Sequence, residues 1–360
     1  MEPLDLIRSL PAYRRLVADV QAGIPLAGLS LPRAVRLPVL VALQQDLNRP
    51  VLFITGRTDQ ALTALDETGF WKRDLLRQNF PEPNPLFYEQ AAWGTVTRRD
   101  RLQTLTLLAR YHMLNAEEPE TPPLIIGPVR AIMTRTLPRR DFIKSTRLLK
   151  VGQTMTLESL LRAWVEIGYE SADVVLAPGQ FSRRGGLLDI WPPAEPFPAR
   201  LDFFGDELDT IRRFDPASQR TVKTLDSLLV TPAREVLPGK AEGLELPFPV
   251  VDEFMLPLLH PTPSSLLDYL PKKSLIVVED LDLLKTIATD VEEQAVKLRQ
   301  ESVTEGTLPA EYPVPYITWS ELLDEITTQS WLELGYSTAA EIEPSELADQ
   351  FHPGQRFGGR

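Results

Sequence analysis

The chain has 360 residues, which is more than one compact core ordinarily accommodates, so two or three domains are expected. It carries 38 lysines and arginines against 50 aspartates and glutamates, and the net charge of -12 argues against broad phosphate-driven DNA binding. Cysteine is absent, which excludes disulfides, thiolate nucleophiles and cysteine-ligated zinc. The first ten residues hold charges and no apolar run, so we expect a cytoplasmic protein that does not span a membrane.

Short apolar runs alternate with amphipathic stretches in much of the chain. Val51–Thr55 is predicted as a buried parallel strand, and Thr58–Thr68 as the helix that follows it. Leu124–Gly127 and Leu275–Val278 have the same apolar character, and the turn-forming segment Pro271–Ser274 precedes the latter. The pattern predicts an α/β domain in which these strands share one sheet.

From about residue 142 to residue 237 the pattern changes to alternating polar and apolar residues, which is typical of half-buried strands. Gly205 and Asp206 lie between two such runs and predict a two-residue hairpin turn. The predicted strands are Leu187–Trp191, Ala199–Phe204 and Glu207–Phe214. A β-rich insert built from hairpins therefore interrupts the α/β domain.

These patterns divide the chain into four consecutive parts. Residues 1–140 are predicted as the first part of the α/β domain, residues 141–235 as the insert, and residues 236–345 as the remainder of the α/β domain. Residues 346–360 are polar, include Pro353 and show no structural element, so we expect a linker toward further domains of a longer protein.

The three histidines, His112, His260 and His352, lie far apart at spacings that do not place two of them on one element. We expect surface or packing roles for them. The sequence therefore predicts no metal site.

An ordered set of motifs spans about forty positions of the insert. It begins with Gly179–Pro193, which reads GQFSRRGGLLDIWPP, and continues with Arg200–Glu207, which reads RLDFFGDE. Arg212, Phe214 and Ser218–Thr221 follow in order. The set resembles the UvrA-interaction domain that UvrB shares with bacterial transcription-repair coupling factors.

The rest of the chain supports the same resemblance. Pro50–Glu67 is similar to the strand and helix after the P-loop helix of UvrB, and Leu124–Arg139 is similar to the strand and loop before its insert. Glu253–Leu270 and the strand at Leu275 resemble the continuation of that domain. The resemblance implies a degenerate helicase-like (RecA-like) parallel-sheet domain interrupted by a β-rich UvrA-interaction domain.

The resemblance raises the question of whether the chain binds a nucleoside triphosphate. A P-loop needs glycine N–H groups around the phosphates, a lysine, and a Ser or Thr on magnesium. At the matching place, which begins at Gly28, Arg33 stands at a glycine position, Ala34 at the lysine position and Val35 at the Ser/Thr position, while Pro32 removes an N–H donor. This degenerate loop is not expected to bind ATP, so we predict no catalytic residue and no cofactor.

Two further features of UvrB have only partial counterparts. Glu279 and Asp280 stand where UvrB has its magnesium-binding acidic pair, and we expect them to be solvated loop carboxylates because no phosphate shares a metal there. The aromatic stretch with Phe87, Tyr88 and Trp93 is too short for the DNA-holding hairpin of UvrB. Packing in a core or loop is the expectation for it, with base stacking as the alternative.

The resemblance also implies which residues contact UvrA: Arg184, Arg200 and Phe204. Arginine and phenylalanine are suited to the centre of an interface. On a strand Arg200 and Phe204 share one face, while Leu201 and Phe203 point to the other and are expected in the core.

Purely structural roles for the same residues remain open at this point. Phe204 can itself be packed inside, and the arginines can be solvated and paired with Asp206 or Glu207. Arg183 is a weaker candidate because it falls one residue from the matched position.

A basic segment, residues 130–150, holds a cluster of cations opposed only by Asp141. DNA phosphates, an acidic partner domain and plain solvation are the three alternatives for it. The cations in its central part are Arg135, Arg139, Arg140, Lys144 and Arg147.

Together these observations predict a non-catalytic docking module of a transcription-repair coupling factor, which recruits UvrA to lesion-stalled RNA polymerase by mimicking UvrB. RNA polymerase and DNA are expected partners of other domains of the full-length protein, and those domains are expected to contact this module intramolecularly. The alternative is a diverged UvrB-type ATPase that binds damaged DNA. A generic nucleotide-binding α/β protein is a third possibility, but it does not explain residues 179–221.

Overall fold

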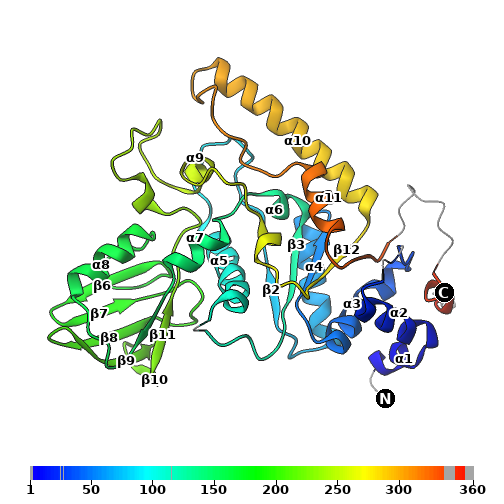
Figure 1. The fold of residues 1–360 in the computed structure, drawn as a ribbon, viewed down its shortest axis with the longest axis horizontal. Helices are drawn as coiled ribbons and strands as arrows, with labels where there is room; N and C mark the ends of the chain where they lie inside the picture. The colour runs from blue at the N-terminus through cyan, green and yellow to red at the C-terminus, as the bar shows by residue number, and fades with distance from the viewer. Residues whose placement is uncertain (1–2, 25, 27, 115, 336–344, 353–360) are drawn as a thin grey trace, which may run out of the picture.

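The computed structural model describes residues 3–24, 26, 28–114, 116–335 and 345–352. Two lobes are visible in Figure 1: an α/β domain that includes the first and last described helices, and a β-rich lobe built from the middle of the sequence. The predicted linker falls partly on residues 353–360, which lie outside the described residues. The described residues just before them form a short 3-10 helix, Ala348–Gln350.

The α/β domain is built on a parallel sheet of five strands in the order β13-β12-β1-β3-β2. The prediction that the three apolar segments share a sheet is confirmed, because they form β1, β3 and β12 in its centre. Two strands were not predicted, β2 and β13, which are three residues long and form the edges. The strands are β1 (Val51–Thr55), β2 (Arg77–Asn79), β3 (Leu124–Pro128), β12 (Leu275–Val278) and β13 (Trp331–Glu333).

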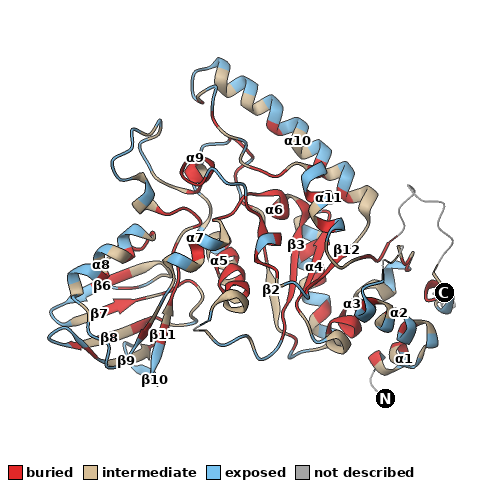
Figure 2. Cartoon of the chain, viewed as in Figure 1, coloured by how far each residue is buried: buried red, intermediate tan, exposed pale blue. Residues whose placement is uncertain are grey.

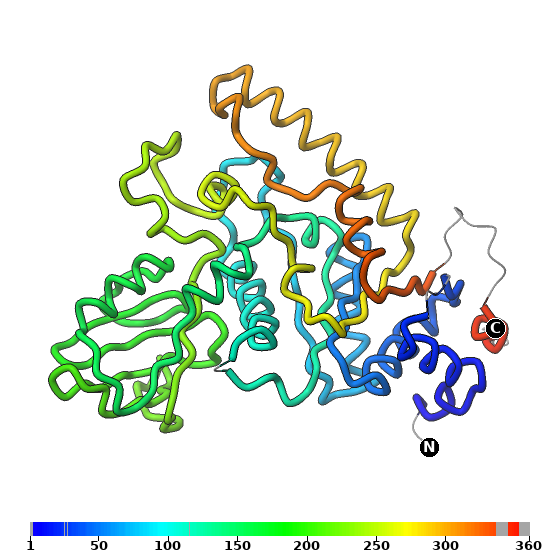
Figure 3. Tube along the Cα trace, viewed as in Figure 1, coloured from blue at the N-terminus to red at the C-terminus, as the bar shows by residue number. Residues whose placement is uncertain are grey.

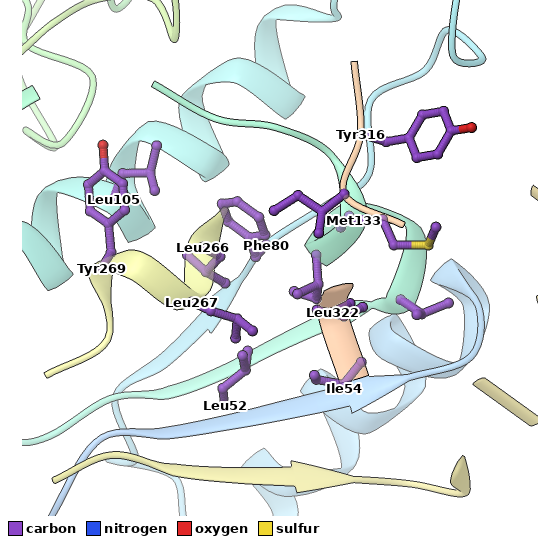
Figure 4. Packing of buried hydrophobic residues seen from close by; sticks show 14 of the residues in the cluster. Leu52, Ile54, Phe80, Leu105, Met133, Leu266, Leu267, Tyr269, Tyr316 and Leu322 are labelled. Carbon is purple, nitrogen blue, oxygen red and sulfur yellow. The ribbon is translucent and has the colours of Figure 1, made fainter. Parts of the chain in front are cut away.

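Both faces of this sheet are buried, as the continuous apolar runs predict. Leu52 and Ile54 point to one core and Val51 and Phe53 to the other, because side chains alternate along a strand. Figure 4 shows the first core, where Leu52 and Ile54 lie near Phe80 and Leu322 of other elements.

Helices cover the two faces in separate groups. The second core receives α1 (Pro3–Ser9), α2 (Pro11–Ala22), α3 (Arg33–Leu47) and α4 (Thr58–Trp71). The first core receives α5 (Thr95–Ala109), α6 (Val129–Met133), α7 (Arg139–Ser145), α10 (Leu281–Thr304) and α11 (Trp319–Thr327), with the short α9 (Leu256–Leu259) beside it. The predicted helix after β1 is confirmed and extends to Trp71.

The insert contains a sheet of six strands in the order β10-β9-β8-β7-β6-β5, antiparallel except for the β5–β6 pair. The predicted hairpin is confirmed, because β8 ends at Phe204 and β9 begins at Glu207. The strands are β5 (Glu170–Ser171), β6 (Gln180–Arg184), β7 (Leu187–Ile190), β8 (Ala199–Phe204), β9 (Glu207–Phe214) and β10 (Thr221–Leu225).

One side of this sheet is covered by α8 (Leu157–Glu166). Trp164 of this helix packs with Leu188, Leu201 and Ile211 of the sheet in a core of its own. The chain enters and leaves the insert through a paired ribbon, β4 (Arg147–Lys150) and β11 (Ser227–Val230). Figure 3 follows the trace from the blue amino-terminal helices into the green insert and back to the orange α10.

A buried ion pair joins the two lobes. Arg101 of α5 donates to both carboxylate oxygens of Glu235, just after β11, at 2.6 and 3.0 Å, and both side chains are fully buried. The rings of Phe80 and Trp93 flank the guanidinium at 4.1 and 4.9 Å. The insert is therefore fixed to the α/β domain at the point where the chain returns from it.

The aromatic stretch before α5 belongs to the interior. Phe87 and Tyr88 are buried and pack against Tyr316, with ring centroids 4.7 and 6.5 Å apart respectively. Packing, rather than an exposed stacking platform, is thus confirmed for these two residues.

Within the described residues, no helix is both long and apolar enough to cross a lipid bilayer. No group of three or more side chains in that part of the chain is arranged to hold a metal ion.

Candidate functional site

The candidate site lies on the face of the six-stranded sheet opposite α8. The strand registers place Arg184 across from Leu187, and Leu187 across from Asp202. Asp189 lies across from Arg200, and Arg200 across from Arg212, on the same side. We call this side the outer face, and its members include Arg184, Leu187, Arg200, Asp202, Phe204 and Arg212.

Phe204 is the most exposed large hydrophobic side chain of the outer face. It is 83% exposed at the end of β8, whereas the preceding Phe203 is 8% exposed and belongs to the insert core. Burial alternates along the whole strand, as period-two side-chain directions require. The alternative in which Phe204 packs inside is therefore wrong.

Arg184 is exposed at the end of β6, just before the turn to β7. Gly185 in that turn has φ +65°, a left-handed conformation that glycine adopts without steric cost. Nη2 of Arg184 donates to the Asp173 carbonyl at 3.1 Å. Arg183 faces the opposite side of the sheet, since its register partner is the buried Leu188.

Arg200 is held in place by the strand next to it. Its Nε and Nη2 donate to the two carboxylate oxygens of Asp189 at 2.7 and 2.8 Å, and these hydrogen bonds raise the pKa of the guanidinium. Asp206 and Glu207 were the partners suggested by sequence proximity, and that suggestion is wrong. The structure thus brings Arg184, Arg200 and Phe204 onto one face.

Two residues of the motif set gain a structural explanation that the sequence did not provide. Gln219 accepts a hydrogen bond from Nη2 of Arg200 at 2.9 Å, and the ring of Phe214 lies 4.5 Å from its guanidinium carbon. Together with Asp189, they surround Arg200 from three separate sub-motifs. The only signal in the sequence was their presence in the same ordered set.

The segment predicted to be a degenerate nucleotide loop, which begins at Gly28, lies beside the end of β13 at the carboxyl edge of the parallel sheet. Backbone N–H groups of residues 29–31 donate to carbonyls of residues 333–335 at 2.8–3.0 Å. In a P-loop such groups point at phosphate oxygens, whereas here they are hydrogen-bonded within the protein. Gly28 lies next to Glu333, and Arg33, Ala34 and Val35 form the first turn of α3.

Glu279 and Asp280 are not simply solvated, so the expectation for them is wrong. Asp280 is the N-cap of α10 and accepts from the Leu283 N–H at 3.0 Å. The Glu279 side chain is 20% exposed and lies 3.9 Å from Arg36, and burial raises the pKa of its carboxyl. An internal ion pair therefore lies at the position expected for a magnesium ligand, beside an open cavity of about 260 Å³.

The basic segment is divided between structural and exposed cations. Arg135 is buried and donates to the carbonyls of residues 260, 261 and 314, and Arg130 pairs with Glu82 at 3.5 Å. Arg139 donates to the Asp268 carbonyl at 2.7 Å. The exposed members are Arg140, Lys144, Arg147 and Lys150.

Two of the three histidines are part of the internal packing. Nδ1 of His260 lies 2.9 Å from Asp141, and burial lowers the pKa of this imidazole to about 4. Nε2 of His112 lies 2.9 Å from the Tyr269 carbonyl. His352 is exposed.

Comparisons with known proteins agree with this geometry. Residues 148–236 match the family model described as the UvrB interaction domain. The chain is 29% identical over 340 residues to the transcription-repair-coupling factor of Bacillus subtilis (strain 168), covering 83% of this chain and 28% of the relative. It is 31% identical over 231 residues to that of Myxococcus xanthus, covering 62% and 19%. The UvrABC system protein B of Acaryochloris marina (strain MBIC 11017) is 33% identical over 129 residues, covering 36% and 19%.

The fold and these matches define the class: an α/β domain with a parallel sheet that carries a UvrB interaction domain as an insert. Within that class, the chain is similar to the amino-terminal, UvrB-like region of transcription-repair coupling factors, which confirms the resemblance that the motifs indicated. The chain spans 28% of the length of the Bacillus subtilis relative and 19% of the Myxococcus xanthus relative.

Proposed function

We propose that this chain is a non-catalytic docking module that binds UvrA through the outer face. By presenting the surface that UvrB presents, it recruits UvrA to an RNA polymerase stalled at a lesion. RNA polymerase and DNA are then contacted by other domains of a longer, cytoplasmic protein. The same domains make intramolecular contacts with this module.

The observation that carries the proposal is the exposure of Phe204 on the same sheet face as Arg184 and Arg200, on the open side of a UvrB interaction domain. A phenylalanine that is 83% exposed gives no packing stabilisation in the free protein. In protein–protein interfaces, however, aromatic side chains and arginines are enriched among the residues that contribute most of the binding free energy. Arg184 and Arg200 lie on the same face as Phe204.

The non-catalytic part of the proposal rests on the loop at Gly28. The N–H groups of residues 29–31 bond to the protein itself, so phosphate binding has to break those hydrogen bonds. The loop lacks the lysine and the hydroxyl that act on phosphates and magnesium, because Ala34 and Val35 stand in their places.

The competing proposal, a diverged UvrB-type ATPase on damaged DNA, finds less support. It needs a free phosphate cradle and an exposed aromatic element for bases. Residues 29–31 and the buried Phe87 and Tyr88 provide neither.

Calorimetric titration of the chain with purified UvrA tests the docking proposal. We expect saturable binding that weakens at least tenfold in Arg184→Ala, Arg200→Ala and Phe204→Ala, a loss of about 1.4 kcal/mol or more each. Phe70→Ala is the matched control, because Phe70 is 86% exposed but lies on α4 of the other domain. Absence of binding at micromolar concentrations, under conditions where UvrB binds UvrA, rules the proposal out.

A further inference from the structure

We propose that Asp189 is a positioning residue for the docking face, and that it acts by fixing Arg200 in the orientation that UvrA recognises. Phe214 and Gln219 complete the same arrangement. This inference rests on the proposed function, because it assigns a role within the face that is proposed to bind UvrA.

The buried Asp189 forms a two-point ion pair with Arg200. Asp189 is 7% exposed and lies on the central strand β7, directly across from Arg200 on β8. Both carboxylate oxygens accept, one from Nε and one from Nη2, at 2.7 and 2.8 Å. Such a two-point contact defines the plane of the guanidinium, which a single hydrogen bond does not.

Two further contacts restrict the orientation of the Arg200 guanidinium. The Phe214 ring lies 4.5 Å from the guanidinium carbon, and Oε1 of Gln219 accepts from Nη2 at 2.9 Å. Gln219 is itself fixed, since its Nε2 donates to the Pro216 carbonyl at 2.9 Å. The turn that carries it is held by Asp215, which accepts from the Ser218 N–H at 2.7 Å.

These contacts decide which part of Arg200 is left for a partner. Nε and Nη2 are occupied, whereas Nη1 has no hydrogen-bond partner among the described residues. The side chain is 23% exposed on the outer face, and Nη1 is the nitrogen left to donate to a partner. The partner chemistry that fits is a carboxylate or carbonyl oxygen next to an apolar pocket that receives Phe204.

The physical gain is preorganisation. A free arginine loses rotamer freedom when a complex immobilises it, whereas Arg200 has already lost that freedom in the unbound chain. Without the Asp189 carboxylate, binding has to order the long Arg200 side chain itself. We therefore expect the loss of this carboxylate to weaken binding by roughly 2- to 10-fold. The effect has to vanish when Arg200 itself is absent.

A double-mutant cycle on UvrA binding tests this dependence. We expect Asp189→Asn to raise the dissociation constant roughly 2- to 10-fold in the native background and less than about twofold when Arg200 is already alanine. Glu195→Gln is the matched control, because Glu195 pairs with Arg213, similarly buried but off the outer face, and it should leave binding unchanged. Circular dichroism melting confirms that each variant is folded at the temperature of the titration.

A second measurement examines the positioning without UvrA. The ¹⁵N relaxation of the Arg200 Nε–H reports its order, and we expect a rigid group in the native chain and a mobile one in Asp189→Asn. An equal loss of affinity from Asp189→Asn in both backgrounds overturns the inference, since Asp189 then acts on the sheet and not through Arg200. Normal binding by Asp189→Asn alongside weak binding by Arg200→Ala overturns it as well. If the native chain does not bind UvrA, the proposed function fails first, and the relaxation data still show whether Asp189 orders Arg200.

Discussion

The Arg101–Glu235 ion pair consists of two charges that are fully removed from solvent, one from each lobe of the molecule. Taking two charges out of water is costly, and the cost is offset here by two short hydrogen bonds and by the rings of Phe80 and Trp93 on the guanidinium. No other pair in the described residues joins the insert to the α/β domain at zero exposure on both sides. The pair therefore ties the insert to the α/β domain.

Removing one partner leaves the other charge buried and uncompensated. We expect Glu235→Gln to lower the free energy of unfolding by about 3–5 kcal/mol, measured by urea denaturation. Glu158→Gln is the control, because the exposed Glu158–Arg162 pair contributes roughly 0–1 kcal/mol. Equal effects of the two substitutions contradict the role assigned to the buried pair.

His260 makes stability depend on pH in a defined direction. Its folded-state pKa is about 4, below the ordinary 6.5, because burial disfavours the charged imidazole. Between these two values the unfolded state binds more protons than the folded state. The contribution of His260 is thus complete above about pH 6.5 and is lost as the pH falls toward about 4.

We expect the native chain to lose about 1–2 kcal/mol more stability than His260→Gln when the pH falls from about 7 to about 5. Asp141 and Lys240, which lie against the imidazole, are present in both proteins, so the difference between the two curves reports the imidazole together with its hydrogen bond to Asp141. His352→Gln, at an exposed position, should follow the native curve. Parallel curves for the native chain and His260→Gln show that the imidazole is not the group responsible.

At the scale of single elements, the side chains of β8 alternate between two environments. Its residues point in turn to the insert core and to the outer face, so Phe203 is buried and its neighbour Phe204 is exposed. This follows from the two-residue period of a strand, and the sequence predicted it correctly. The same reasoning predicted the strands β1, β3 and β12 and the turn after β8.

We expect Phe203→Ala to lower the free energy of unfolding by about 3–5 kcal/mol, because it leaves a cavity in the core. Phe204→Ala should change stability by less than about 0.5 kcal/mol and yet lose UvrA binding, because its side chain is in water. Thermal melting and calorimetry on the same two samples make the comparison. Destabilisation of similar size in both variants means that Phe204 serves the fold and not the interface.

Other elements could not be predicted from local pattern. The edge strands β2 and β13 are three residues long, and β2 reads Arg-Gln-Asn, so no apolar run marks it. Their strand conformation comes from pairing with β3 and β12, which are far away in sequence. Asp280 as the N-cap of α10 is a local feature, but its neighbour Glu279 pairs at 3.9 Å with Arg36 of α3, which is far away in sequence.

On the scale of the whole molecule, the two domains present different surfaces. The insert presents an open sheet face with an exposed phenylalanine, while the N–H groups of residues 29–31 in the α/β domain are hydrogen-bonded to residues 333–335. The sequence offers Ala34 and Val35 where the proposed resemblance to a P-loop requires a lysine and a hydroxyl. It could not predict the hydrogen bonds of residues 29–31, because they join residues about three hundred positions apart.

We therefore expect no saturable binding of ATP with magnesium at concentrations up to about 1 mM. A ligand at a hundred times its dissociation constant stabilises a folded protein by about 2.7 kcal/mol, so melting curves with and without nucleotide are a sensitive test. UvrB treated in the same way provides the positive control. A nucleotide-dependent rise in melting temperature revives the proposal of a diverged ATPase.

The most direct test of the central claim is competition between this chain and UvrB for UvrA. Labelled UvrB bound to UvrA is titrated with the unlabelled chain, and fluorescence anisotropy reports the bound fraction. The account predicts that the native chain displaces UvrB completely and that Phe204→Ala does not, because both proteins need the same surface of UvrA. Simultaneous binding of the chain and UvrB, or no displacement at concentrations where the chain is shown to bind, contradicts the claim that this module takes the place of UvrB.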